Sequence, residues 1–181
     1  MKKYPKLFFI LLLINISCKK DEENIFTPTL PFEAFSTAYL NNGDFPQKYT
    51  CDGLSVSPPI SWKNVPANTK GFAITMHHIP PTGEKHVYMC VYNIPISTTN
   101  YPENTSNIGL WGINTVNGKN SYTPPCSQGP GAKVYIITVY ALSEQPTITT
   151  ATNKVTMDVL LDAISNKTIA KSTISVTYSR P

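Results

Sequence analysis

All three histidines of the chain lie within a span of ten residues, at His77, His78 and His86. Successive residues of a β-strand point to opposite faces of a sheet, so His77 and His78 cannot hold one ion between them. His78 and His86 could share a pocket if the strands that carry them are neighbours. Imidazole can become cationic near neutral pH, and such a pair could therefore attract an anion. A metal site at these two side chains lacks a nearby third ligand, so we expect neither a metal nor another cofactor.

The cysteines offer a second kind of chemistry. They are Cys18, Cys51, Cys90 and Cys126. A nucleophilic Cys126 near His86 would need a thiolate with a lowered pKa, a base within hydrogen-bond reach and a third group to orient that base. The sequence offers no recognisable third group, no Gly-x-Ser-x-Gly and no paired-carboxylate site. We therefore expect a protein that is not an enzyme, and a cysteine-dependent enzyme is the less favoured alternative.

The N-terminus is typical of an exported protein. Three lysines fall in the first six residues, and the apolar run over residues 7–14 is too short to cross a bilayer, which takes about 20 residues. Asn15-Ile16-Ser17-Cys18 resembles a lipobox, whose cysteine receives a diacylglycerol and becomes the first residue after cleavage. Asn15 stands where lipoboxes usually carry an apolar residue, so the alternative is an ordinary secretory signal. We predict a lipoprotein of the bacterial cell envelope, anchored through Cys18 to the outer membrane or at the cell surface.

These features divide the chain into three parts. Residues 1–17 are predicted to be the lipoprotein signal peptide, residues 18–31 the lipidated Cys18 with its tether, and residues 32–181 a single domain. Removal of the signal peptide lowers the formal net charge from +4 to +1, because three lysines leave with it. No basic block remains that could follow a phosphate backbone, so we expect no nucleic-acid partner.

The domain is predicted to consist mainly of β-strands. Of all residues 41% are hydrophobic and only 14% are charged, which is typical of a packed domain. Runs of Val, Ile, Thr and Tyr predict the strands; the main ones are Gly71–His78, Val87–Ile94, Lys133–Leu142 and Ser172–Tyr178, with shorter segments at 32–40 and 60–62. Strict alternation along the second of them would place Tyr88 and Tyr92 on one face and Val87, Met89 and Val91 on the other.

One helix is predicted between the last two long strands. Thr156 is a plausible N-cap, and Asn166 is a reasonable stop. Between them, four apolar side chains follow i, i+3, i+4, i+7 spacing: Met157, Leu160, Leu161 and Ile164. Many strands, a single late helix and no alternation of strands with helices predict an antiparallel, mostly β fold.

Four blocks of sequence carry a family resemblance through their order and spacing. They are Lys48-Tyr49-Thr50-Cys51-Asp52-Gly53 with residues 57–62; residues 70–78; His86 with Val91-Tyr92-Asn93-Ile94-Pro95; and Gly112-Ile113-Asn114 with Tyr122-Thr123-Pro124-Pro125-Cys126 and residues 131–142. Together they resemble the bacterial, Raf-kinase-inhibitor-like branch of the phosphatidylethanolamine-binding protein family. The resemblance extends roughly over residues 32–180.

This resemblance implies a fold and a site. The implied fold is mostly β, with a large antiparallel sheet packed on a smaller sheet and one C-terminal helix. The implied site is a shallow cavity near one end, which in the family holds phosphate or carboxylate groups, including phospholipid headgroups. Its walls would come from residues 76–81, from His86, from Pro125-Cys126 and from residues 131–135.

The sequence departs from the family pattern at this cavity. The family usually has Asp-Pro-Asp-x-Pro where this chain has His78-Ile79-Pro80-Pro81-Thr82, so no carboxylate is present. The family's His-Arg-Tyr becomes Lys133-Val134-Tyr135, which leaves an ammonium group nearby. A histidine in place of an aspartate makes the site more favourable for an anion. We therefore predict a small anionic ligand or phospholipid headgroup as partner, bound by His78, His86, Lys133, Tyr122, Tyr135, Pro125 and Cys126.

Several alternatives stay open at this point. In the family fold the loops of Cys51 and Cys126 would both lie at the cavity, which implies a disulfide between them; a free Cys126 is the alternative. Relatives are known as inhibitors of kinases or proteases, so a protease inhibitor or another protein-interaction module is the alternative function. A homodimer is compatible with the sequence. Asp52 is expected to have only a structural role, as the cap of a turn.

Overall fold

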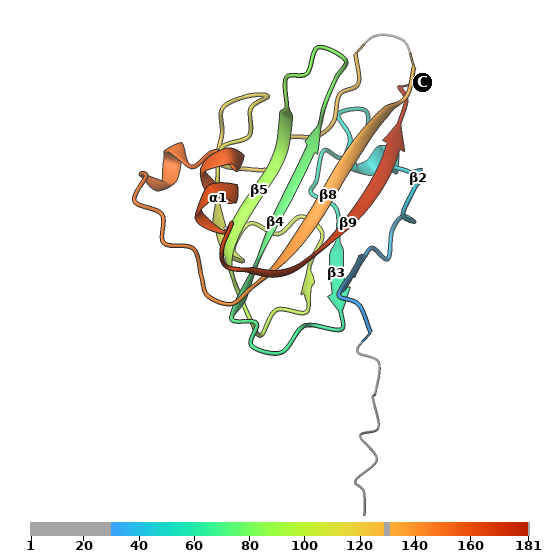
Figure 1. Ribbon diagram of the computed structural model, residues 1–181. Helices are drawn as coiled ribbons and strands as arrows, with labels where there is room; N and C mark the ends of the chain where they lie inside the picture. The colour runs from blue at the N-terminus through green and yellow to red at the C-terminus, as the bar shows by residue number, and fades with distance from the viewer. Residues whose placement is uncertain (1–29, 129–130, 181) are drawn as a thin grey trace, which may run out of the picture.

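The computed structural model describes residues 30–128 and 131–180 (Figure 1). The predicted signal peptide, Cys18 and most of the predicted tether lie outside the described residues. In the described ranges, no helix combines the length and the hydropathy that a bilayer crossing requires.

Two β-sheets form the body of the domain (Figure 1). The larger sheet has six strands in the order β2 (Gly43–Asp44), β9 (Thr168–Tyr178), β8 (Lys133–Leu142), β4 (Gly71–His78), β5 (His86–Pro95) and β7 (Leu110–Trp111). The smaller sheet has three, in the order β1 (Glu33–Phe35), β3 (Ile60–Lys63) and β6 (Asn100–Tyr101). All pairings are antiparallel except that of β2 with β9. The predicted fold, a large sheet packed on a smaller one, is confirmed.

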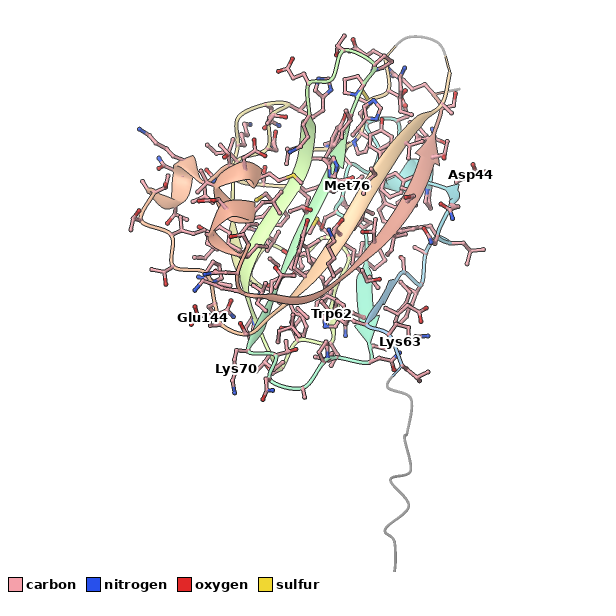
Figure 2. All side chains as sticks on the ribbon, viewed as in Figure 1. Asp44, Trp62, Lys63, Lys70, Met76 and Glu144 are labelled. Atoms are coloured by element: carbon pink, nitrogen blue, oxygen red, sulfur yellow. A yellow bond between two sulfur atoms is a disulfide. The ribbon has the colours of Figure 1, made fainter. Side chains whose placement is uncertain are left out.

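The main core lies between the two sheets. Met76 of β4 and Trp62 of β3 belong to this inner cluster of buried side chains (Figure 2). The rings of Trp62 and Phe72 contact each other with their centroids 4.8 Å apart, which joins the small sheet to the large one. Burial of these large apolar surfaces is the dominant favourable term for such a fold.

A second, smaller core covers part of the outer face of the large sheet. Helix α1 (Met157–Ala163) packs Leu160 against this face, together with Cys90 and Tyr140. The predicted N-cap is confirmed, because the Thr156 side chain accepts a hydrogen bond from the backbone N–H of Val159 at 3.2 Å. Two short 3₁₀ helices complete the structure, η1 (Gln47–Tyr49) and η2 (Thr152–Lys154).

Strand β9 begins at Thr168, earlier than the sequence predicted. Its first residues alternate between exposed and half-buried positions and carry little apolar periodicity, so the pattern alone did not show them as a strand. They are held in the sheet by pairing with the end of β8, where Thr168 lies opposite Leu142.

Strand β5 departs from strict alternation. Met76 of β4 pairs with Met89 and the next residue, His77, pairs with Val87, so Tyr88 is an extra residue in β5. This β-bulge turns Tyr88 to the inner face, beside Met89. Tyr92 packs in the outer cluster. The prediction that Tyr88 and Tyr92 share a face was therefore wrong, because a bulge shifts the parity of the residues that precede it.

Candidate functional site

A cavity of about 330 Å³ opens at the end of the large sheet where β4 ends and β5 begins. Its lining includes five of the seven predicted ligand contacts: His78, His86, Lys133, Tyr135 and Cys126. Pro80, in the segment that the resemblance implied, also lines it. The sequence did not predict the rest of the lining, which is Tyr88, Val116, Ser127 and Gln128. Among the described residues that line the cavity, none is aspartate or glutamate.

His78 and His86 face each other across the pairing of β4 with β5. His78 is the last residue of β4, His86 is the first of β5, and the two are direct partners in the register. Their ring centroids are 6.4 Å apart. Nδ1 of His78 lies 2.8 Å from the carbonyl oxygen of Val134, which can only accept, so Nδ1 carries a hydrogen. Nε2 is therefore the ring nitrogen of His78 that is available to a ligand.

His77 is separated from this site, as the strand geometry predicts. It does not line the cavity, and it pairs with Val87, which belongs to the outer cluster. Burial lowers the pKa of His77, and the nearby charge of Lys85 lowers it further, so the neutral ring is favoured. Lys133 supplies the permanent positive charge of the cavity, and the other two histidines supply imidazole groups that can form hydrogen bonds.

Tyr135 and Tyr88 form the buried inner wall of the cavity. Tyr135 is 1% exposed and Tyr88 is 6% exposed, and their rings meet edge to face with centroids 5.2 Å apart. The ring of His78 lies 5.5 Å from that of Tyr135. Burial raises the pKa of both tyrosine hydroxyls, so both stay protonated at neutral pH. They can donate hydrogen bonds to a ligand without adding negative charge.

Lys133 brings a full positive charge to the same end of the sheet. It is the first residue of β8, one residue before the carbonyl group that holds His78. Lys133 forms no ion pair with any described residue. Its ammonium group is therefore not neutralised by any described side chain, and the described lining of the cavity has a basic character.

Ser127 places a buried hydroxyl in the third wall of the cavity, next to Cys126. The residue is 5% exposed, and its Oγ makes no well-formed hydrogen bond with a described residue, although it lies close enough to the Tyr135 hydroxyl to lower the pKa of that group. A ligand oxygen could accept a hydrogen bond from this hydroxyl.

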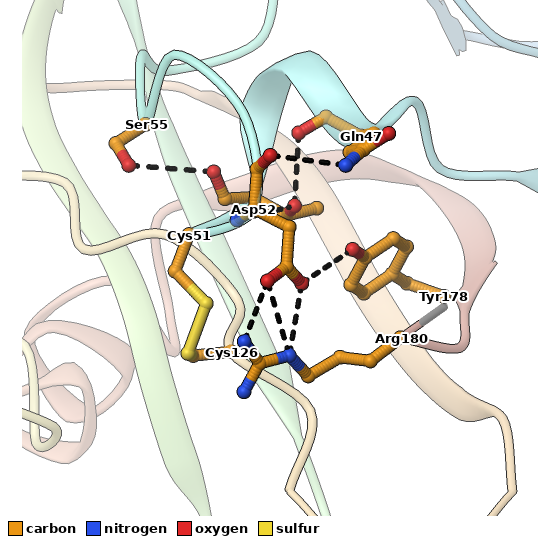
Figure 3. The surroundings of a disulfide bond; sticks show 8 residues. Gln47, Cys51, Asp52, Ser55, Cys126, Tyr178 and Arg180 are labelled. Carbon is orange, nitrogen blue, oxygen red and sulfur yellow. Dashed lines mark hydrogen bonds and ion pairs between the residues drawn. A yellow bond between two sulfur atoms is a disulfide. The ribbon is translucent and has the colours of Figure 1, made fainter.

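A disulfide between Cys51 and Cys126 fixes this third wall (Figure 3). The backbone N–H of Cys51 also donates to the carbonyl oxygen of Pro125 at 3.0 Å. Pro125 therefore supports the wall from behind and is not part of the lining. Because the sulfur of Cys126 is bonded, it is not the free thiolate that nucleophilic catalysis would require.

The carboxylate of Asp52, next to this disulfide, ties the C-terminal end of β9 to the same loop. It accepts a hydrogen bond from the Tyr178 hydroxyl at 2.6 Å and forms an ion pair with Arg180, also at 2.6 Å (Figure 3). The hydrogen bonds from Arg180, and then that from Tyr178, lower the pKa of Asp52. The sequence indicated only a turn cap, since it gave no signal that joins residues so far apart in the chain.

Tyr122 is not brought into the cavity. Its hydroxyl donates to the backbone carbonyl of Tyr49, which holds the segment before Pro124 against η1. Of the two tyrosines that the sequence offered as ligand contacts, the structure therefore places only Tyr135 in the lining.

The described residues contain no group of three or more His, Cys, Asp or Glu side chains placed to hold a metal ion. His78 and His86 are the two candidate ligands that the cavity offers. Its remaining polar groups are ammonium, hydroxyl and amide, which suit a hydrogen-bonded anion better than a metal.

The sequence of the chain is similar to those of known proteins. The family described as phosphatidylethanolamine-binding protein matches residues 35–179. A UPF0098 protein of Chlamydia trachomatis serovar D is 30% identical over 151 residues, which is 80% of this chain and 97% of the relative. A UPF0098 protein of Aquifex aeolicus is 35% identical over 117 residues, covering 61% of this chain and 68% of the relative.

Solved structures agree with the sequence matches. The crystal structure of CT736, a putative phosphatidylethanolamine-binding protein homolog from Chlamydia trachomatis, has a TM-score of 0.76 at 27% identity and covers 83% of this chain and 99% of that one. The structure of Escherichia coli YbcL, described as a member of the mammalian family of the same name, has a TM-score of 0.75. At 22% identity, this second likeness is one of fold.

Removal of the disulfide tests how far it stabilises the domain. The bond joins positions 75 residues apart, and loss of such a cross-link releases chain entropy in the unfolded state. We expect the double variant Cys51→Ser/Cys126→Ser to lose about 2–4 kcal/mol of unfolding free energy in urea titrations. Dithiothreitol should destabilise the wild type by a similar amount and leave the double variant unchanged. Equal urea midpoints for oxidised wild type and double variant would contradict this.

The Asp52 network predicts a pH-dependent contribution to stability. Because the pKa of Asp52 is lower in the folded state, its ionised form stabilises the fold above the ordinary carboxyl pKa of about 3.9, and this contribution is lost as the pH falls through the folded pKa. Asp52→Asn should therefore lower the unfolding temperature at pH 7, and the difference from wild type should shrink between about pH 4 and pH 2. Asp44→Asn, at an exposed residue outside every described ion pair, is the matched control. A difference that does not change with pH would count against the assigned role.

Proposed function

Because the chain belongs to the phosphatidylethanolamine-binding protein family, we propose that its cavity binds a small anion, such as a phosphate, a carboxylate or a phospholipid headgroup, without transforming it. The observation that carries the proposal is the convergence of His78, His86 and Lys133 on one cavity whose described lining holds no carboxylate. Opposite charge and hydrogen-bond donors together are what a protein uses to hold a phosphate or carboxylate.

Each group of the cavity has a distinct part in this proposal. Lys133 supplies charge, and Nε2 of His78 donates to a ligand oxygen when the ring is cationic. Ser127 and Tyr135 are neutral donors, and the buried Ser127 hydroxyl makes no well-formed hydrogen bond with a described residue. His86 lies opposite His78 and adds a second imidazole on the far side of the ligand.

The size of the cavity limits what it can enclose. A volume of about 330 Å³ is at the lower end of the range of about 300–1,000 Å³ for ligand pockets. Such a space suits a phosphate or a compact headgroup, and the acyl chains of a whole lipid would have to remain outside.

Binding without catalysis agrees with the chemistry of the lining. Cys126 is occupied by its disulfide, and the described lining has no carboxylate that could act as a base or orient a histidine. The two buried tyrosines have raised pKa values, which makes them poor bases and poor nucleophiles at neutral pH.

We propose further that the domain is attached to the cell envelope through a lipid on Cys18. The support is the sequence of the leader, with its basic start, short apolar run and lipobox-like end. In Figure 1 the N-terminal end of the described domain lies at the bottom and the β4–β5 connection at the top. An anchored domain could thus present its cavity away from its own membrane, where soluble anions are available.

Isothermal titration calorimetry with sulfate at pH 6 tests the anion site. We expect sulfate to bind the wild-type protein with a measurable heat, because Lys133 and the hydrogen-bond donors of the cavity would hold its oxygens. Lys133→Met should weaken binding by at least about tenfold, whereas Lys171→Met, at the other end of β8–β9, should have no effect. A folded protein that binds neither sulfate, phosphate, acetate nor phosphoethanolamine at pH 6 would refute the site.

Fractionation of expressing cells tests the anchor. Wild-type protein should partition into the detergent phase, and its N-terminal peptide should have the mass of a diacylglycerol-modified cysteine. Cys18→Ala should remove both properties, because the thiol that accepts the lipid is absent. Identical partitioning of the two proteins would show that Cys18 is not lipidated.

A further inference from the structure

Resting on the proposed anion site, we infer that the cavity selects phosphates and carboxylates with a neutral or apolar substituent and discriminates against headgroups that carry an ammonium group, such as phosphoethanolamine. The inference follows from the charge of the site, whose described lining has a basic side chain and no acidic one. Its ionisable side chains are His78, His86, Lys133 and two tyrosines, and no acidic side chain is among the described residues of the lining.

The acidic side chains of the described residues lie outside the lining of the cavity, and several of them are held in ion pairs. The carboxylate of Asp52 is held by Arg180 at 2.6 Å, and that of Asp158 by Lys85 at 2.9 Å. Glu84 is exposed in the β4–β5 connection and does not line the cavity. An ammonium group that entered the cavity would therefore meet no carboxylate in the described lining.

The absence of a carboxylate matters because the phosphate and the ammonium group of phosphoethanolamine lie close together. Its ammonium group is joined to the phosphate by a two-carbon chain, so a phosphate seated beside Lys133 keeps the ammonium close to the same cations. Like charges at such short range repel strongly, and more so where protein excludes part of the solvent. Anion affinity gained from Lys133 and the histidines is thus partly lost for a zwitterion.

The apolar part of the lining favours a different substituent. Val116, which lines the cavity, is 51% exposed, and Pro80 adds a second apolar side chain to the lining. Exposed apolar side chains gain from contact with the carbon atoms of an alkyl or glycerol group. They offer nothing to an ammonium group, which would lose hydration on contact with them.

A matched pair of ligands tests the inference on the wild-type protein. Propyl phosphate and phosphoethanolamine have similar size and share the phosphate, and they differ in a terminal methyl or ammonium group. We expect propyl phosphate to bind at least about tenfold more tightly at pH 7 by calorimetry. If inorganic phosphate binds but phosphoethanolamine binds as well as propyl phosphate, the inference is wrong and the anion site stands. If neither these compounds nor sulfate, phosphate or acetate binds to the folded protein, the proposed function itself fails.

A second pair of comparisons shows whether the ligand is a soluble phosphate or the headgroup of a membrane lipid. Glycerol 3-phosphate is compared with phosphoethanolamine, and vesicles of phosphatidylglycerol are compared with vesicles of phosphatidylethanolamine. Preference for the glycerol compound in either comparison supports the inference and identifies the source. Equal or reversed preference in both comparisons overturns it.

Variants at His86 test whether charge is the cause. The side chain of His86 makes no hydrogen bond to a described residue, so it can be exchanged without loss of such a contact. His86→Asp should lower the preference for propyl phosphate over phosphoethanolamine by about fivefold or more, because it supplies a counter-charge. His86→Asn, which has the size of Asp but is neutral, should lower the ratio by a smaller factor, because it removes an imidazole without adding a counter-charge. A similar change of ratio in both variants would show that shape, not charge, sets the preference.

Discussion

The site depends on the antiparallel register that sets the end of β4 between the start of β5 and the start of β8. This register pairs His78 with His86 and places the ring of His78 beside that of Tyr135. A slip of one residue would turn every side chain of β4 to the other face of the sheet and bring His77 in place of His78. The hydrophobic pattern opposes such a slip, since Phe72, Ile74 and Met76 would leave the core together.

The positive charge of the cavity is not offset by the carboxylates of the surrounding loops, because these carboxylates are bound to other side chains. Asp52 is bound by Arg180 and Tyr178, and Glu103 accepts hydrogen bonds from Lys48 and from Tyr49. Both carboxylates therefore hold loops together, and neither of them lines the cavity. No acidic side chain of the described lining offsets the charge of Lys133.

The sequence predicted the long strands and much of the site because these depend on local patterns. Strands β4 and β8 have the predicted bounds, and the Thr156 cap is local chemistry. Tyr88 was not predicted to line the cavity, because the face to which it points depends on the β-bulge in β5. At this bulge β5 has one residue more than β4 between two successive pairings. Tyr122 was misplaced for a similar reason, since its hydroxyl is bound by the backbone of Tyr49. Contacts of this kind join segments 73 residues apart and leave no periodic signal.

What distinguishes this cavity is that most of its donors are fixed before a ligand arrives. His78 is oriented by the Val134 carbonyl, the wall of Ser127 is held at Cys126 by the disulfide, and Tyr135 is confined by the rings of His78 and Tyr88. Fixed donors lose little conformational entropy on binding, so more of their interaction energy appears as affinity. Lys133 differs, since its long side chain adds charge without fixed geometry. Under the proposed function, the rigid groups would set where the oxygens of an anion lie, and Lys133 would supply the charge that attracts it.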